Sequence, residues 1–253
     1  MIKSVLLLEE QGPFRADQLN PDDPYELSHG HAIPCMPTGG RGARAAGAGA
    51  KALGSDPAVV ELGLDAGYSP DPGTLRAPDI SVGPIRNEPG WIPGVPPLAV
   101  EYADTGQDEE QLALKIADLL AAGTQLVWVV RLTGPRRIEV HAPGKPVRLA
   151  NPGERLEAPG ILANPVPVEA LYDPKASAEV ASRNELERLG YASLDAVRAE
   201  GLRSAIHEVL TARGLTVPED VTVAIASCQD FALLKRWVGK AVTVASAADL
   251  VAG

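Results

Sequence analysis

Two carboxylates and one lysine mark the segment from Pro78 to Lys115 as the part of the chain whose residue types suggest chemistry. Asp79 follows Pro78 at the head of a short apolar run, and Glu101 ends a second run, Leu98–Val100. Carboxylate oxygens are the ligands that Mg²⁺ prefers, and two often suffice because the ion keeps several waters. Such an ion activates a bound water and neutralises charge on a phosphoryl oxygen. The spacing therefore favours metal-dependent phosphoryl chemistry.

Lys115 lies in the clearest helical pattern of the chain, residues 107–122. Three acidic residues begin this pattern, where the helix dipole favours negative charge. Its apolar side chains recur with helical spacing and form one stripe: Leu112, Ile116, Leu119 and Leu120. Lys115 lies at the rim of that stripe, so we expect its amine to point toward the sheet edge and to stabilise transition-state charge. Gln111, one turn earlier, shares this face and is a candidate to assist.

Each of these residues also has a plainer interpretation. An Asp after Pro is usually a turn residue, and a Glu at a strand end is usually solvated. A lysine beside a leucine stripe usually extends along the apolar surface with its amine in water. The chemical interpretation depends on all three occurring together, in an order of elements that can bring them to one place.

The order of elements predicts one mixed sheet with helices packed against it, an α/β (α+β) architecture. Strands follow from alternating or continuous apolar runs, and turns from Gly, Pro, Ser and Asp clusters. The pattern predicts, in order, a hairpin at 25–36, a helix at 41–53, strands at 58–68, 75–82 and 98–103, the helix at 107–122, and strands at 126–132 and 136–141. Residues 142–172 read as short strands and loops that close this domain.

The chain changes character after residue 173. We expect two domains, residues 1–173 with the mixed sheet and residues 174–253 as a small helical extension. Amphipathic patterns predict four helices in the extension, at about 185–198, 202–213, 230–238 and 245–251.

The formal charge of −10 argues against a simple nucleic-acid-binding protein, which usually presents a basic face. Residues 1–173 hold 14 basic and 23 acidic residues, so the acidity belongs to the first domain. A nuclease would need a local basic rim, and Arg41, Arg44, Arg76 and Arg86 are candidates for it. No apolar stretch approaches the roughly 20 residues of a membrane span, and the two cysteines form no CxxC pair. We expect a cytoplasmic protein without a membrane partner.

The residues described above resemble the Uma2 (DUF820) family of restriction-endonuclease-like proteins, within the PD-(D/E)xK nuclease superfamily. The resemblance rests on Pro78-Asp79, Val100-Glu101, Lys115 and the strand Val127–Val130. Tyr25-Glu26-Leu27 with Gly30, and the approach from Tyr68 to Asp79, add to it. It covers roughly residues 20–172. The part from Arg183 resembles helical C-terminal extensions of some members.

The resemblance implies an αβββαβ core with a mixed sheet. It also implies that Asp79 and Glu101 bind Mg²⁺ or Mn²⁺ and that Lys115 is the catalytic lysine, with Glu26 as an additional acidic contact. One departure concerns Ala103, which stands where the (D/E)xK pattern has lysine. The lysine function then falls to Lys115 on the next helix. This fold often pairs, so a homodimer is one expected assembly.

Three functions remain open from the sequence. The leading hypothesis is a metal-dependent endonuclease that hydrolyses DNA phosphodiester bonds, with Arg41, Arg44 and Arg76 as nucleic-acid contacts; Trp91, in the Pro-rich loop, is a weaker candidate to stack on a base. The second is a catalytically inactive scaffold or interaction protein of the same fold, favoured by the net charge and by Ala103. The third is a hydrolase of a smaller phosphate ester, which would have a closed pocket in place of an open groove.

Overall fold

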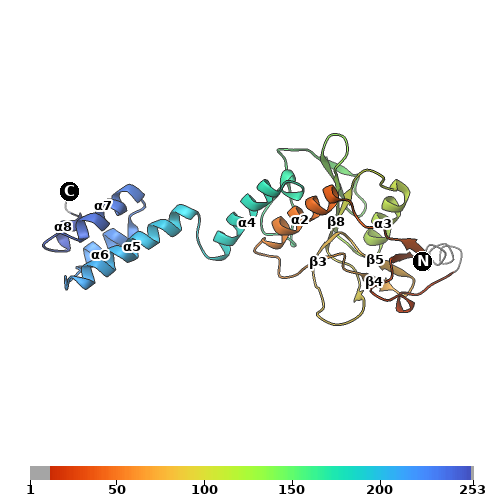
Figure 1. Ribbon diagram of the computed structural model, residues 1–253, viewed down its shortest axis with the longest axis horizontal. Helices are drawn as coiled ribbons and strands as arrows, with labels where there is room; N and C mark the ends of the chain where they lie inside the picture. Colours follow the sequence, from red (N-terminus) through yellow and green to blue (C-terminus); the bar gives the residue numbers. More distant parts are fainter. Residues whose placement is uncertain (1–11, 252–253) are drawn as a thin grey trace. The chain divides into compact units, whose positions relative to one another are not determined.

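The computed structural model describes residues 12–251, which divide into two compact units, Met1–Glu185 and Leu186–Gly253. Figure 1 shows strands and helices in the larger unit and helices alone in the smaller one. We describe each unit by itself.

A six-stranded mixed sheet forms the centre of the larger unit. Its strand order is β11-β10-β9-β8-β6-β3, and only β8 and β9 are parallel neighbours. The strands are β3 (Leu62–Leu64), β6 (Ile80–Val82), β8 (Leu98–Ala103), β9 (Leu126–Arg131), β10 (Arg137–His141) and β11 (Arg148–Ala150). With α2 (Gly40–Gly54) before β3 and α3 (Glu109–Ala121) between β8 and β9, the order α2-β3-β6-β8-α3-β9 confirms the predicted αβββαβ core.

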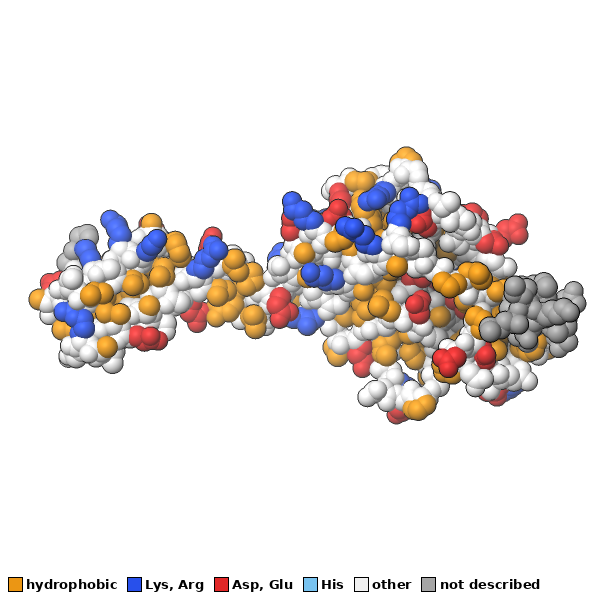
Figure 2. Space-filling view, in the orientation of Figure 1, with side chains coloured by type: hydrophobic (Ala, Val, Ile, Leu, Met, Phe, Trp, Pro, Cys, Tyr) orange, Lys and Arg blue, Asp and Glu red, His pale blue; other side chains and the backbone are white. Residues whose placement is uncertain are grey.

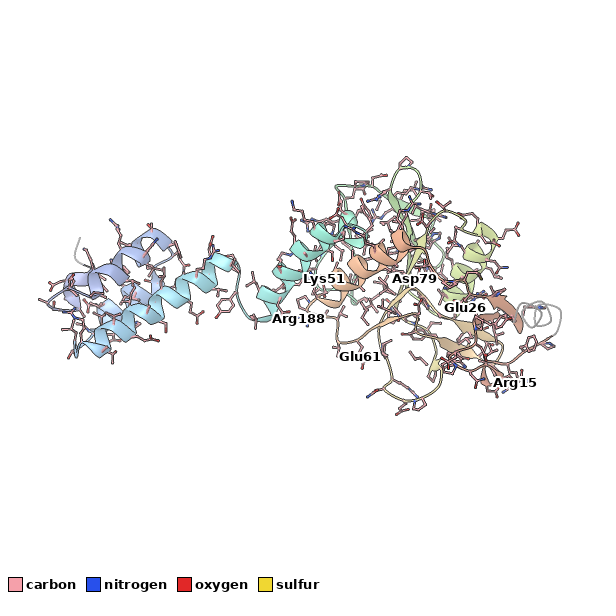
Figure 3. All side chains as sticks on the ribbon, in the orientation of Figure 1. Arg15, Glu26, Lys51, Glu61, Asp79 and Arg188 are labelled. Carbon is pink, nitrogen blue, oxygen red and sulfur yellow. The ribbon has the colours of Figure 1, made fainter. Side chains whose placement is uncertain are left out.

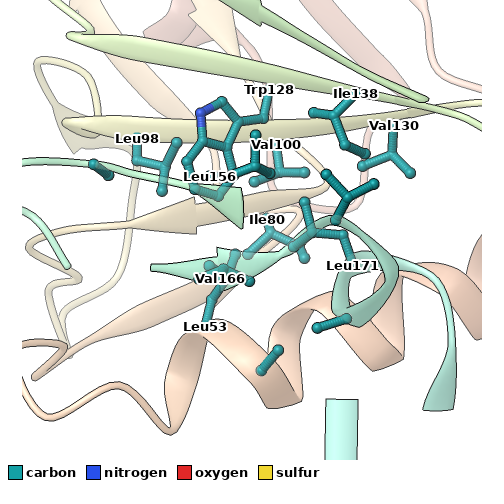
Figure 4. Packing of buried hydrophobic residues seen from close by; sticks show 14 of the residues in the cluster. Leu53, Ile80, Leu98, Val100, Trp128, Val130, Ile138, Leu156, Val166 and Leu171 are labelled. Carbon is teal, nitrogen blue, oxygen red and sulfur yellow. The ribbon is translucent and has the colours of Figure 1, made fainter. Parts of the chain in front are cut away.

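Side-chain alternation divides this sheet into two apolar faces. Val100 of β8 and Trp128 of β9 belong to the main core with Leu53 of α2, as Figure 4 shows. The residues that alternate with these along the same strands, such as Ala99 and Val127, face the other side and pack with the leucine stripe of α3. Successive residues of a strand face opposite sides, so this register decides which polar residues of β8 meet α3.

The larger unit also contains a second, smaller sheet. Its order is β2-β1-β5-β4-β7, with bounds Tyr25–Ser28 (β1), His31–Pro34 (β2), Tyr68–Asp71 (β4), Thr74–Arg76 (β5) and Ile92–Pro93 (β7). The predicted hairpin is confirmed as β1 and β2. Its two-residue turn places His29 at φ 48° and Gly30 at φ 83°, the positive angles that a tight hairpin turn of this kind needs.

The prediction of one strand over residues 75–82 was wrong, because these residues form β5 and β6 in different sheets. Ala77, Pro78 and Asp79 separate them. A proline has no N–H to donate to a ladder, which makes it a natural place for a chain to leave one sheet and enter another. The strand expected over 58–68 is also divided, since Leu62–Leu64 forms β3 and Tyr68 begins β4 in the other sheet.

Short elements complete the larger unit: η1 (Ala16–Gln18), β12 (Arg155–Leu156), β13 (Val166–Pro167), η2 (Val168–Leu171) and α4 (Pro174–Arg188). Most of α4 packs here although the sequence grouped it with the helical extension. Val180 enters the main core, Ser177 Oγ donates to the Ala48 carbonyl over 2.7 Å, and Asn184 Nδ2 donates to Ser55 Oγ over 3.0 Å. Because of these contacts, the larger unit extends to Glu185.

The smaller unit consists of α5 (Leu194–Ala212), α6 (Glu219–Ser227), α7 (Phe231–Ala241) and α8 (Ala248–Val251). Ile206, Leu234 and Trp237 are among the residues of its apolar core. The helix predicted over 185–198 was wrong. Gly190, at φ 81°, ends one helix, and Ser193 caps the next by accepting from the Ala196 N–H. The sequence reading also missed α6. No helix among residues 12–251 is long and apolar enough to cross a membrane.

Candidate active site

The pairing of β6 with β8 brings the two predicted metal ligands together. Ile80 pairs with Val100, so the antiparallel register sets Asp79 opposite Glu101. Glu101 lies on the face of β8 that meets α3, because its neighbours Val100 and Tyr102 belong to the α2 side. Asp79 Oδ2 accepts a hydrogen bond from the Tyr102 N–H over 2.6 Å, which fixes the carboxylate at the end of β6.

Lys115 points inward from α3 and meets three oxygens. Its Nζ lies 2.9 Å from Glu26 Oε1, 3.0 Å from Glu101 Oε1 and 2.7 Å from the Ala77 carbonyl oxygen. The side chain is 15% exposed, so it is not the solvated lysine of the plainer interpretation. The contact with the Ala77 carbonyl is a hydrogen bond, and the contacts with Glu26 and Glu101 are ion pairs.

A second cluster of charges lies beside Lys115. Arg76 donates to Glu26 Oε2 over 3.0 Å and to Asp118 Oδ2 over 2.6 Å, and Ser28 Oγ donates to the same Asp118 oxygen over 2.7 Å. Arg76 is only 2% exposed. This burial corrects the expectation that Arg76 contacts nucleic acid: its guanidinium is committed to two buried carboxylates.

Burial and neighbouring charges shift the protonation of this site. Burial raises the pKa of Glu101 to about 8, against the opposing effect of Lys115. Burial also raises the pKa of Asp79, although Lys115 and the Tyr102 N–H oppose it. Burial disfavours charge on Glu26 as well, but Lys115 and Arg76 together hold its pKa below the usual value. Despite its own burial, Lys115 has a raised pKa because Glu101, Glu26 and Asp79 surround it. The acidic neighbours therefore favour the protonated form of the lysine.

These residues line one cavity of about 770 Å³. Glu26, Asp79, Glu101 and Lys115 all contribute to it, and Gln111 joins them from the exposed side of α3. Figure 3 labels Glu26 and Asp79 in the larger unit. The structure thus brings the predicted catalytic residues, and the tentative Glu26 and Gln111, to a single concave site.

Asp79 and Glu101 are the residues that could hold a divalent cation. Glu101 Oε1 is buried and makes no well-directed hydrogen bond, although Lys115 Nζ lies 3.0 Å away. The two carboxylates have raised pKa values and share the single charge of Lys115, and a divalent ion would add positive charge there. Within residues 12–251, no three His, Cys, Asp or Glu side chains converge as a complete ligand set. An ion at Asp79 and Glu101 would therefore keep positions for water and phosphate oxygens, as Mg²⁺ usually does.

The comparison with family models decides the classification of the chain. Residues 12–166 match the Uma2 model, which is described as "Putative restriction endonuclease". The chain belongs to the Uma2 family. No curated protein matches it. A crystal structure from Anabaena variabilis ATCC 29413, described as "a putative nuclease belonging to DUF820", has a similar fold, with a TM-score of 0.55 and 18% identity over 63% of this chain and 98% of that one. At that identity the likeness concerns the fold alone.

The other basic residues predicted to serve this Uma2 site stand apart from its cavity. Arg41 pairs with Asp104, and Arg44 is exposed on α2. Neither residue lines the cavity, and neither does Arg86. The cations within the cavity wall are Arg76 and Lys115, and both are bound to carboxylates.

The sequence reading of this Uma2 chain missed Asp118 and Ser28. Asp118 is 8% exposed and lies one turn after Lys115, inside the apolar stripe of α3. A charged residue within an apolar stripe signals a buried partner, and this signal was present in the sequence. Ser28 offered no such signal, because its role depends on the packing of the hairpin against α3.

Proposed function

We propose that this protein is a metal-dependent nuclease that hydrolyses phosphodiester bonds of DNA. The observation that carries the proposal is the cavity where Asp79 and Glu101, opposite each other on β6 and β8, meet the buried amine of Lys115. Family membership supports the same class of activity. The inactive-scaffold alternative does not account for the cost of burying these charges.

Asp79 and Glu101 would hold Mg²⁺ or Mn²⁺. When bound, such an ion supplies an activated water and positive charge at a phosphoryl oxygen. Lys115 stays protonated because of its three acidic neighbours, so it acts through charge and hydrogen bonding and not as a base. Its amine faces the same cavity, where it stabilises negative charge that develops on the phosphate. Glu26 also pairs with this amine, as Glu101 does.

The test is cleavage of plasmid and oligonucleotide DNA by the full chain with Mg²⁺ or Mn²⁺. We expect Asp79→Ala, Glu101→Gln and Lys115→Ala each to lower the rate by about 10²–10³-fold or more. The matched controls are Glu110→Gln, an exposed glutamate on α3, and Lys51→Ala, an exposed lysine on α2. Both controls should cleave like the wild type.

Two outcomes would contradict the proposal. An inactive wild type, across both metals and all DNA forms, would favour the scaffold function. Unchanged activity in Asp79→Ala and Lys115→Ala would place the chemistry elsewhere in the molecule.

A further inference from the structure

The charge of the cavity is unlike that of a surface for duplex DNA. Five carboxylates line it, from Asp23, Glu26, Asp65, Asp79 and Glu101, against two cations. Both cations are already paired with buried acids. Proteins hold a duplex mainly through free Lys and Arg side chains along its phosphates. The cavity wall offers no such row.

On the face drawn in Figure 2, Lys and Arg side chains of the larger unit gather mainly toward the top of the view. The two cations of the cavity wall are already paired with acids. A metal ion would therefore be the main attraction for a phosphate in the cavity.

The remaining walls include exposed apolar side chains beside the polar Thr38, Gln107 and Gln111, and the cavity is large enough for a nucleotide. Met36 is 84% exposed and Leu64 is 56% exposed, and both line the cavity with Ile33 and Trp91. The volume of about 770 Å³ falls in the range of roughly 300–1,000 Å³ that is usual for small-molecule sites. Size and apolar character match a single base better than a double helix.

Trp91 is held as a fixed aromatic wall. Its Nε1 donates to the Ala16 carbonyl over 2.8 Å. On the other side its ring packs against Gly67, where a Cβ atom would lie 2.5 Å from Trp91 Cε3. Only glycine permits so close an approach. Trp91 also lines the cavity, and a ring fixed in this way loses little rotamer freedom on binding.

We propose that the cavity takes one unpaired nucleotide of a DNA strand, with the base against Trp91 and the phosphodiester at Asp79 and Glu101. The proposal rests on the proposed nuclease function and specifies its substrate class as single-stranded or unpaired DNA. Bases stack on aromatic side chains with little regard to sequence. A paired base reaches such a cavity only after it leaves the duplex, at a cost in unpairing and unstacking.

The test measures binding separately from cleavage. With Ca²⁺ in place of Mg²⁺, the affinity of the full chain for a labelled 20-nucleotide strand, its duplex and a dinucleotide is compared by fluorescence anisotropy or competition. We expect the strand to bind at least about tenfold more tightly than the duplex. The logarithm of its affinity should fall with that of salt at a slope of about −2 or shallower, because few cations meet phosphates.

Variants at Trp91 test the wall itself. Trp91→Leu should weaken strand binding by about 5- to 150-fold, the usual effect of losing one stacked base. Trp91→Phe keeps an aromatic face but loses the bond to Ala16, so it should bind nearly like the wild type. Val60→Ala, at a 93% exposed position outside this cavity, is the control. If both variants lost strand affinity equally, the loss would come from disturbed structure and not from stacking. That result would overturn the assignment of Trp91.

The remaining outcomes separate this inference from the proposed function. Duplex binding and cleavage equal to or better than those of the strand would overturn the inference while leaving a nuclease. A dinucleotide that binds as tightly as the strand would overturn the strand as substrate and assign the site to small phosphodiesters. Preferred strand binding without cleavage under any metal would refute the nuclease and support the unpaired nucleotide as ligand.

Discussion

The two units of this protein differ in what they bury. Among the described residues, all buried side chains that are polar or charged lie in the larger unit. They include Glu26, Arg76, Glu101 and Asp118. The described part of the smaller unit has an entirely apolar core around residues such as Leu234. Buried charges cost stability unless they are paired. The larger unit thus gives up stability to build its site, whereas the smaller unit's interior serves folding alone.

The same contrast recurs within the site. The cluster of Arg76, Glu26, Asp118 and Ser28 is closely hydrogen-bonded, as a buried structural network should be. The neighbouring pair, Asp79 and Glu101, is less satisfied, with a buried Glu101 oxygen that lacks a directed hydrogen bond. A network whose hydrogen bonds are all made fixes its side chains in place. A side chain with unused hydrogen-bonding capacity remains available to bind a ligand.

Removing Arg76 should have the largest effect on stability. Arg76→Met removes the buried cation from Asp118 and leaves Glu26 paired with Lys115 alone, which should lower the free energy of unfolding by about 3–5 kcal/mol. Urea denaturation monitored by circular dichroism measures the change. In the smaller unit, Arg198→Met removes an exposed pair with Asp195 and should cause no measurable loss. Equal effects of the two substitutions would break the comparison between the units.

Leu234→Ala tests the apolar core of the smaller unit. Leu234 is fully buried, and its truncation should cost about 2–4 kcal/mol through lost burial and a cavity. The loss should appear as faster hydrogen exchange in peptides from Leu186–Gly253. DNA cleavage below the unfolding temperature should remain at the wild-type rate, because no residue of this core lines the site. A large loss of cleavage in a folded variant would show that the smaller unit takes part in catalysis.

The sequence predicted the core of the larger unit well, because its elements have strong local signals. The strand Leu98–Ala103 and the helix around Lys115 follow from apolar runs, an acidic first turn and a glycine end. The division of residues 75–82 between two sheets could not be predicted in this way. Both halves are apolar and extended, and only tertiary pairing shows that the chain changes sheets at Pro78.

The site followed from the sequence only in part. Asp79, Glu101 and Lys115 share one cavity as the resemblance implied, but their chemical roles stay predictions. Arg76 was misassigned because a basic residue near a nuclease motif suggests a phosphate contact. Its actual partners, Glu26 and Asp118, lie 50 and 42 residues away along the chain. Such long-range pairing has no signal in local spacing.

Divalent ions should stabilise the larger unit selectively. A ligand that binds only the folded state adds about 2.7 kcal/mol at a concentration a hundred times its Kd. Mg²⁺ should therefore slow hydrogen exchange in peptides around Asp79 and Glu101 and leave those of the smaller unit unchanged. The Asp79→Asn variant, which lacks one ligand charge, should lose most of this protection, and Glu110→Gln should keep it. Equal protection of both units would indicate general salt effects in place of a site.

The smallest expected effect concerns pH, and its sign follows from the raised pKa of Glu101. Burial raises the pKa of Glu101 to about 8 in the folded state, against about 4.5 in the unfolded chain. Without divalent ions, the stabilisation from the Glu101 proton is present below the unfolded pKa and is lost as pH rises toward 8. Glu101→Gln mimics the protonated carboxyl and removes the dependence.

The difference in unfolding free energy between Glu101→Gln and the wild type should therefore grow by on the order of 1 kcal/mol from pH 6 to pH 8. Urea denaturation at each pH measures it, with Glu110→Gln as the matched exposed control. Mg²⁺ favours the ionised carboxylate and should reduce the difference in the wild type's favour. If the wild type instead gained stability over the variant from pH 6 to 8 without metal, the charge of Lys115 would fully compensate that of Glu101. The site would then have no uncompensated negative charge to attract a metal ion.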